Sequence, residues 1–210
     1  MKKGKLIVID GGEGSGKSTQ IQFLKEKYPL ALFTREPGGS EYGEEIRNLM
    51  LKSPLAKDAS AETQFGLIWA NRADHVEKKI RPALEKGINV ISDRFDSCTF
   101  AYQIYGQEGT DLKDLFFEIR KTFLKGCVPD LYVFFDISPE ESLKRTTVRA
   151  NLFGESNHFD ERKVEFHARV REGYAEFARL FPKNTKIINA HGSKEEVRKS
   201  LQKVLDPILG

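Results

Sequence analysis

The 210-residue chain has little cysteine, a single tryptophan and no long apolar run, and its charges of opposite sign nearly balance. The two cysteines, Cys98 and Cys127, share no metal-ligand spacing with each other or with the four histidines, so no zinc module is indicated. We expect both to be reduced thiols of a cytoplasmic protein.

The N-terminal residues lack the pattern of a targeting segment. The apolar run Leu6–Ile9 ends at Asp10, whereas a secretory signal needs at least about seven apolar residues and a membrane-spanning helix about 20. We therefore expect a cytoplasmic protein that associates with no membrane. The formal net charge of +3 is too small for a nucleic-acid-binding surface but is compatible with anionic substrates.

The chain does contain short apolar runs that alternate with helical patterns. Continuously apolar runs are typical of strands covered on both faces, and they occur at 5–10, 30–34, 89–93, 131–137 and 186–190. Helical patterns begin in the glycine-rich segment near residue 11, at 41–52, 61–86 and 97–125, and after capping boxes at Ser138 and Ser193. This order predicts one α/β domain over residues 1–210, a three-layer α/β/α fold with a five-stranded parallel sheet.

Residues 145–162 differ from the rest because they are charged, contain Gly154 and lack a strand pattern. Two interpretations remain open for them. They form either a solvated helix followed by a loop, or part of a helical lid over a binding site, about residues 142–162.

Residues 11–18, GGEGSGKS, match the G-x-x-x-x-G-K-[ST] pattern of a phosphate-binding P-loop. Glycines let consecutive backbone N–H groups surround phosphate oxygens, and the N-terminus of the following helix favours the same anion. A glycine-rich turn without a ligand is disfavoured because the match lies between an apolar strand and a helix. We therefore predict that ATP or GTP is bound by Gly11, Gly12, Glu13, Gly14, Ser15, Gly16, Lys17, Ser18 and Thr19.

The strand that ends at Asp93 and Arg94 distinguishes among P-loop proteins. A GTPase usually carries N-K-x-D to read guanine, and this sequence has no such tetrapeptide. Ring and transporter ATPases carry an apolar strand ending in Asp-Glu, whereas here arginine follows the aspartate. The pair offers one group to a hydrated Mg²⁺ and one to a second phosphate ester, which favours a small-molecule kinase.

Three further groups of residues indicate an acceptor that already carries phosphate. Arg35 lies in the glycine-rich turn TREPGG after the second predicted strand, where parallel sheets bind ligands. Trp69 and Arg72 share one helix face, which places a flat apolar surface beside a guanidinium group. Each group alone has a structural explanation, such as a surface ion pair or core packing. A third set of polar side chains shares a helix face at i, i+3 and i+4: Thr99, Tyr102 and Gln103.

Five motifs together resemble those of the bacterial thymidylate kinases and cover nearly the whole chain. They are IDGGEGSGKSTQ at 9–20, FTREPGGS at 33–40, SDRFDSCTFAYQI at 92–104, PDLYVFFDISPEESLKR at 129–145 and EFHARVREGYA at 165–175. The resemblance implies a P-loop NTPase fold and transfer of the γ-phosphate of ATP to dTMP, giving dTDP for dTTP biosynthesis. It also implies a homodimer packed through helices that include residues 61–80.

The resemblance also implies roles for the acceptor-site residues. Arg35 and Arg94 would hold the phosphate of dTMP. Arg72 would hydrogen-bond to the thymine edge, and Thr99 and Gln103 would lie near the base.

Two residues would contact the deoxyribose. Tyr102 would lie beneath the sugar and disfavour a 2′-hydroxyl. Glu13 would hydrogen-bond to the 3′-hydroxyl and pair with nearby arginines, although a carboxylate in an anion-binding loop could also be a solvated loop residue. With an acid in the loop, the lid must supply the positive charge, and Arg145 and Arg149, spaced i, i+4, match the basic lid positions.

The implied metal is Mg²⁺, bound together with ATP. Ser18 would offer its hydroxyl and Asp93 would hold the ion through water, and Asp10 is close enough in sequence to assist. Lys17 and Mg²⁺ would neutralise the charge that develops on the transferred phosphoryl group.

The chain departs from the family pattern at two places. Where a phenylalanine usually stacks on thymine, it has Ile68 beside Trp69, so either Ile68 supplies apolar cover or Trp69 takes the stacking role. The usual short lid turn is replaced by a longer segment, 151–161, with His158 near the expected arginine, where it is either inert or a phosphate contact. Residues 189–193 are expected to pass near adenine.

Two alternatives to a dTMP kinase remain. One is a P-loop kinase for another nucleoside monophosphate or for a deoxynucleoside. The other is a nucleotide-binding protein that has lost catalysis, which only the altered lid favours.

Overall fold

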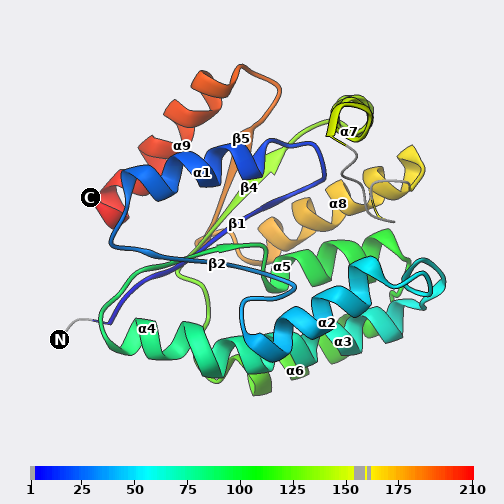
Figure 1. Cartoon of the computed structure of the whole chain (residues 1–210), viewed down its shortest axis with the longest axis horizontal. Coiled ribbons are helices and arrows are strands. Elements are labelled where there is room, and N and C mark those ends of the chain that lie inside the picture. Colours follow the sequence, from blue (N-terminus) through cyan, green and yellow to red (C-terminus); the bar gives the residue numbers. More distant parts are fainter. Residues whose placement is uncertain (1–2, 154–158, 160–161) are drawn as a thin grey trace.

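The computed structural model of the chain describes residues 3–153, 159 and 162–210, with only the backbone described over 149–153. A five-stranded, all-parallel sheet in the order β2-β3-β1-β4-β5 forms its centre (Figure 1). This confirms the predicted fold class. The strands are β1 Leu6–Gly11, β2 Leu32–Arg35, β3 Val90–Asp93, β4 Leu131–Asp136 and β5 Thr185–Asn189.

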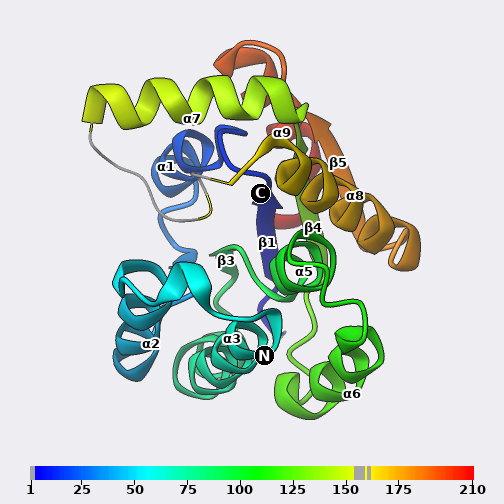
Figure 2. The ribbon, with the colours of Figure 1, turned by 90° about the vertical axis from the view of Figure 1, so that its right-hand side faces the viewer.

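Helices cover both faces of the sheet (Figures 1 and 2). One face carries α1 (Lys17–Lys27) and α9 (Lys194–Leu209). The other carries α2 (Glu41–Lys52), α3 (Ala61–His75), α6 (Leu112–Leu124) and α8 (Val164–Leu180). Shorter or peripheral elements complete the chain: the 3₁₀ turn η1 (Ala56–Asp58), α4 (Arg81–Glu85), α5 (Asp96–Thr99) and α7 (Pro139–Phe153).

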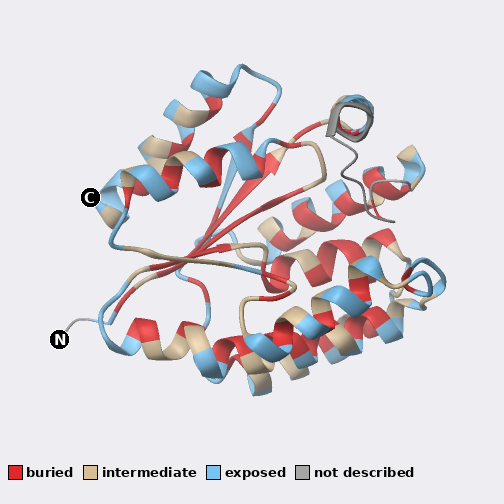
Figure 3. Cartoon of the chain, in the orientation of Figure 1, coloured by how far each residue is buried: buried red, intermediate tan, exposed pale blue. Residues whose placement is uncertain are grey.

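The sequence of β1 shows why a three-layer arrangement forms. Successive side chains of a strand point to opposite faces, and in β1 both sets are apolar. Leu6 and Val8 join the core under α2, α3, α6 and α8, whereas Ile7 and Ile9 join the core under α1 and α9. Burial of each such side chain contributes roughly 1.5–3 kcal/mol. Figure 3 shows β1, β3 and β4 largely buried between two helical layers, whereas β2 and β5 at the sheet edges are more exposed.

The predicted helical segments match the structure except around residues 97–125. The segment 61–86 is helical as predicted, with a π-helical stretch, Val76–Ile80, between α3 and α4. The segment 97–125 is interrupted after a second π-helical stretch, Phe100–Gly106. Gly109 lies so close to Gln103 O that a Cβ there would be 2.9 Å away, and the chain turns at this point before α6 begins. Helix α8 contains the family motif at 165–175 but is not among the helices predicted from the sequence pattern.

None of the helices in the described part of the chain combines the length and apolarity needed to cross a bilayer.

Candidate active site

The P-loop joins β1 to α1 and places its lysine against its own backbone. Lys17 Nζ donates to the carbonyl oxygens of Gly11 at 2.7 Å and Gly12 at 2.8 Å, and its side chain is buried. Burial, followed by the nearby guanidinium of Arg94, lowers the pKa of Lys17. A bound phosphate would compensate that desolvated charge better than the two carbonyls do.

A cavity of about 420 Å³, here called the central cavity, lies beside this loop and is the size of a small-ligand site. Residues from distant parts of the sequence meet on its walls because parallel strands end at the same edge of the sheet. The predicted residues that line it are Glu13, Gly14, Ser15, Gly16, Lys17, Ser18, Thr19, Ile68, Asp93, Arg94, Thr99, Tyr102, Gln103 and Arg145.

Arg94 and Glu13 form an ion pair in the wall of the central cavity. Arg94 Nη2 donates to the Glu13 carboxylate and to Tyr102 Oη at 3.3 Å, and Tyr102 Oη donates to Glu13 Oε1 at 3.1 Å. Arg94 has a φ of 66°, a left-handed conformation that is uncommon for non-glycine residues and often occurs at functional sites. The Glu13 side chain therefore faces the cavity rather than the interior of the anion-binding loop.

Asp10 lies beneath this ion pair and is fully buried. Its Oδ1 accepts from Gly11 N at 2.9 Å and from Tyr174 Oη at 2.6 Å, and its Oδ2 accepts from Ser97 Oγ at 2.6 Å. Both oxygens are thus occupied by protein donors, and among the described residues that line the central cavity Asp10 is absent. Asp10 Oδ1 lies 3.5 Å from Arg94 Nη1, so Asp10 supports Arg94 from below, and its assistance to Mg²⁺ stays a prediction.

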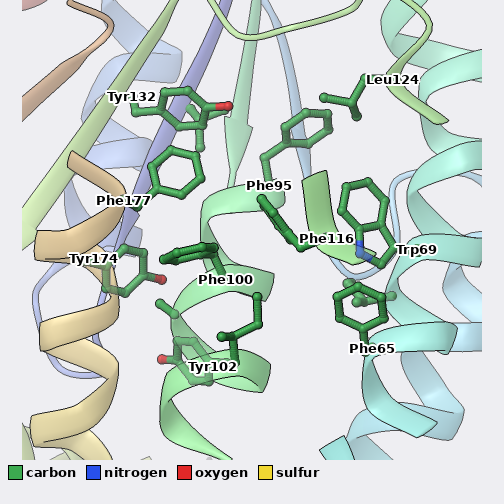
Figure 4. Close-up of a cluster of buried hydrophobic side chains, with 14 of the residues drawn as sticks. Phe65, Trp69, Phe95, Phe100, Tyr102, Phe116, Leu124, Tyr132, Tyr174 and Phe177 are labelled. Atoms are coloured by element: carbon green, nitrogen blue, oxygen red, sulfur yellow. The ribbon is translucent and has the colours of Figure 1, made fainter. Parts of the chain in front are cut away.

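Neighbouring residues Ile68 and Trp69 point in different directions. Ile68 lines the central cavity. Trp69 is 1% exposed and packs edge-on against Phe65 and Phe116, with ring centroids 6.1 and 5.6 Å away (Figure 4). Of the two alternatives, the structure places Ile68 at the cavity, and Trp69 belongs to the core because its indole completes the aromatic cluster.

Arg72 is fully buried behind the cavity wall. Its Nε donates to Glu36 Oε2 at 2.8 Å and its Nη2 to Thr99 Oγ1 at 3.0 Å. Its guanidinium also lies 4.4 Å from the Trp69 ring centroid. Its Nη1 has no hydrogen-bond partner within the described part of the chain, which leaves one buried donor available to a ligand.

The structure does not bring Arg35 to the central cavity. Its side chain is half exposed and pairs with Glu44 at 2.9 Å. It lines a neighbouring cavity that shares Ser18 and Asp93 with the central one. Arg47, which the sequence did not single out, lines the central cavity together with Arg94 and Arg145 and donates to Pro37 O at 2.8 Å.

Ser18 and Asp93 fit the predicted Mg²⁺ site. Both line the central cavity, and Asp93 Oδ1 is buried without a hydrogen-bond partner among the described residues. In that part of the chain, no cluster of three or more His, Cys, Asp or Glu side chains could hold a metal alone. This agrees with Mg²⁺, which usually binds through one or two protein groups, waters and substrate phosphates.

A second cavity, the outer cavity, of about 380 Å³ lies on the other side of the P-loop. It shares Gly14, Ser15, Gly16, Thr19 and Arg145 with the central cavity. Its remaining wall comes from α1, from the loop before α9 and from the first turn of α9, and this loop is the segment expected near adenine. Arg145 Nη1 donates to Ala190 O at 3.1 Å and Nε to Glu141 Oε1 at 2.8 Å. Arg149 lies one turn further along α7, its side chain outside the described residues, as is His158.

Comparisons with known proteins identify the family. The sequence profile described as thymidylate kinase matches residues 9–201. The chain is 40% identical over 216 residues to the thymidylate kinase of Carboxydothermus hydrogenoformans, covering 99% of this chain and 100% of that protein. It is 40% identical over 212 residues to that of Maridesulfovibrio salexigens, covering 97% and 96%. The chain belongs to the thymidylate kinase family.

A solved thymidylate kinase structure has the same fold. The crystal structure of the enzyme from Ehrlichia chaffeensis superposes with a TM-score of 0.74 at 28% identity, covering 97% of this chain and 99% of that one. The family consists of phosphotransferases, which makes the P-loop and the central cavity the candidate active site.

Several residues of this thymidylate kinase site were not selected from the sequence. Tyr174 belongs to the motif at 165–175 and Glu36 to TREPGG, but neither motif predicts a role for them. Arg47 had no signal beyond its charge. Phe159 could not be placed from sequence; it lines the central cavity and packs edge-on against Tyr102 with ring centroids 5.4 Å apart.

Proposed function

We propose that the protein transfers the γ-phosphoryl group of ATP to the 5′-phosphate of dTMP, giving dTDP and ADP. The observation that carries this proposal is the Glu13–Arg94–Tyr102 cluster, which meets the P-loop in one cavity. A nucleotide whose phosphate rests on Arg94 has its acceptor oxygen beside the loop that holds the donor phosphates. Such placement provides most of the catalysis in phosphoryl transfer.

The outer cavity suits the donor nucleotide. Its wall includes the small residues Ala190, Gly192 and Ser193 of the loop before α9, and we propose that adenine binds there mainly through main-chain contacts. The phosphates would then extend along Gly14–Gly16 towards the central cavity, which shares these residues. Lys17 would leave its two carbonyl partners to contact the β and γ phosphates.

Mg²⁺ would be held by Ser18 and, through water, by Asp93. When bound it neutralises negative charge on the phosphate oxygens. Arg145 already lies between the two cavities, and Arg149 follows it by one turn of α7. We propose that both face the transferred group.

The other end of the central cavity suits the thymine base. Ile68, Thr99 and Gln103 line it, and the free Nη1 of the buried Arg72 is a donor for a carbonyl oxygen of the base. We propose that Tyr102, which lines the same cavity, lies beneath the deoxyribose and disfavours a 2′-hydroxyl. In this arrangement Arg47 lies closer to the acceptor than Arg35 does, so we assign Arg35 a smaller role in phosphate binding.

We further propose a cytoplasmic homodimer that binds neither membrane nor nucleic acid. The dimer would bury the outer faces of α2 and α3, and on α2 Tyr42 and Leu49 are 65% and 51% exposed. Light scattering of the purified protein measures the oligomeric state directly.

A coupled assay of ADP release tests the activity. With ATP and Mg²⁺, we expect ADP release to depend on dTMP and to be much slower with dUMP, dCMP or GMP. The variant Lys17→Ala serves as the inactive control. Faster turnover of dCMP or GMP than of dTMP would reassign the acceptor, and acceptor-independent binding of ATP without turnover would indicate a binding protein.

A further inference from the structure

Three buried side chains of α3 hold the turn that follows β2. Asn71 Oδ1 accepts a hydrogen bond from Gly38 N at 2.8 Å. Arg72 Nε donates to Glu36 Oε2, and His75 Nδ1 lies 2.9 Å from Glu36 Oε1. The three helix residues are fully buried and Glu36 is 3% exposed. The turn is thus fastened to α3 through both its backbone and its carboxylate.

His75 uses both nitrogens of its ring in this arrangement. Glu36 Oε2 accepts from Arg72, and a tautomer of His75 with the proton on Nδ1 lets that nitrogen donate to Glu36 Oε1. His75 Nε2 then accepts from Thr34 Oγ1, which lies 2.7 Å away. A single tautomer with the proton on Nδ1 satisfies both partners and joins β2 to the turn.

The turn also packs directly on the edge of the imidazole. A Cβ added at Gly39 would lie 2.4 Å from His75 Nε2, and the φ of Gly39 is +88°. Only glycine fits this approach, so the ring sets the path of the backbone above it. A change in the ring would therefore move the turn.

The His75 ring affects the central cavity indirectly, through residues that line it. Among the described residues that line the cavity are Glu36 and Thr99 but not His75. Arg72 connects these two, because it donates to both of them. Whatever fixes Glu36 therefore also fixes the guanidinium behind the cavity wall.

We propose that His75 is a positioning residue for acceptor binding. It holds Glu36 Oε1 so that Glu36 Oε2 stays on Arg72 and the Arg72 Nη1 donor keeps a fixed direction. Without the imidazole, one oxygen of a buried carboxylate would lose its partner, and the carboxylate would turn to recover it. The proposal rests on the proposed use of the central cavity for dTMP.

The test compares two substitutions on either side of histidine in size, one larger and one smaller. His75→Phe keeps a ring over Gly39 but removes both hydrogen bonds, whereas His75→Asn retains an amide N–H able to reach Glu36. We expect His75→Phe to raise the KM for dTMP at least about tenfold with the KM for ATP within about twofold, and His75→Asn to recover most of that loss. Exposed Lys78, changed to Gln, is the matched control on the same helical segment and should leave both constants unchanged.

Thr34→Val provides a second route if His75→Phe fails to fold. It removes only the partner of His75 Nε2, and we expect a selective rise of about three- to tenfold in the KM for dTMP. Nitrogen chemical shifts of the His75 ring should show the proton on Nδ1. Folded variants with an unchanged KM for dTMP, equal rises in both KM values, or a proton on Nε2 would each overturn the proposal. A wild-type protein that ignores dTMP would instead refute the proposed function.

Discussion

Glu13 contacts two different parts of the structure, helix α7 and the wall of the central cavity. Its backbone carbonyl accepts from Ser142 Oγ at 2.7 Å, while its carboxylate accepts from Arg94 and Tyr102. Main chain and side chain thus serve different surroundings, the first docking α7 on the P-loop and the second contacting the central cavity. An acid in the anion-binding loop is tolerated because its carboxylate pairs with Arg94, away from the backbone N–H groups that face the phosphates.

We expect Glu13→Ala to raise the KM for dTMP by one to two orders of magnitude and to lower kcat, with ATP affinity nearly unchanged. Removal of the carboxylate leaves Arg94 without its closest counter-charge, so the guanidinium shifts towards Asp10. Steady-state kinetics with each substrate varied in turn measures both constants. A change confined to ATP affinity would show that the side chain serves the donor nucleotide.

Alanine substitutions of the neighbours Ile68 and Trp69 distinguish a residue that contacts the ligand from one that packs in the core. Ile68→Ala should raise the KM for dTMP severalfold with a small loss of stability, because it enlarges a cavity wall. Trp69→Ala should cost about 3–5 kcal/mol of unfolding free energy, because it empties a packed site. Urea unfolding and kinetics on both variants distinguish these outcomes. The reverse pattern would place the indole, not the isoleucine, against the base.

At the scale of elements, α7 lies so close to the P-loop that its position depends on a single glycine. A Cβ at Gly14 would lie 2.7 Å from Ser142 O, and the φ of Gly14 is +66°. Ser142 Oγ and Arg145 add hydrogen bonds to Glu13 O and Ala190 O. The N-terminal half of α7 is therefore fixed over the phosphate-binding loop. This contact also sets the path of the backbone in the next turn of the helix.

Arg149 occupies that next turn of α7. We expect Arg149→Ala to lower kcat by about two to four orders of magnitude with a modest effect on the KM for ATP, because an arginine of this kind stabilises charge that develops in the transition state. Exposed Lys144 on the same helix, changed to Gln, is the control. Single-turnover measurements separate the chemical step from product release. An unchanged rate of that step would remove Arg149 from the mechanism.

The elements themselves were largely predictable, and their side-chain directions were not. Buried parallel strands and capped helices leave local patterns, so all five strands and α2 followed from the sequence. The interruption after Gly106 involves the close approach of Gly109 to Gln103, and the two glycines of this turn are a local signal that the sequence interpretation missed. The directions of three side chains could not be predicted, because the side of an element that faces a cavity depends on what packs against its other side. These residues are Ile68, Trp69 and Arg35.

At the scale of the whole molecule, the buried carboxylate of Asp10 lowers the stability of the fold, while its contacts position residues of the candidate site. It lies in the central strand, and its contacts tie β1 to α5, through Ser97, and to α8, through Tyr174. Burial raises the pKa of its carboxyl, and Arg94 and the two hydroxyl donors only partly oppose this shift. The buried carboxylate therefore lowers the free energy of unfolding. Its functional benefit, we infer, is that it helps to hold Arg94 in position.

We expect Asp10→Asn to be more stable than the wild type at pH 7 and less active. The Asn Oδ1 can keep the bonds from Gly11 and Tyr174, and its amide can donate to Ser97 Oγ after that hydroxyl turns. A folded-state pKa above the unfolded value means that the contribution of Asp10 to stability is complete below about 3.9 and is lost as the pH rises through the folded pKa.

The advantage of Asp10→Asn should therefore shrink as the pH falls towards about 4, by about 1.4 kcal/mol for each unit of pKa difference. Urea unfolding of both proteins between pH 4 and 8 measures the difference. Ser97→Ala removes one donor to the same carboxylate and should enlarge the penalty, because that hydroxyl lowers the pKa of Asp10. An advantage that stayed constant with pH would mean that packing, and not the buried charge, separates the two proteins. A variant that was more stable and equally active would show that Arg94 does not need Asp10 beneath it.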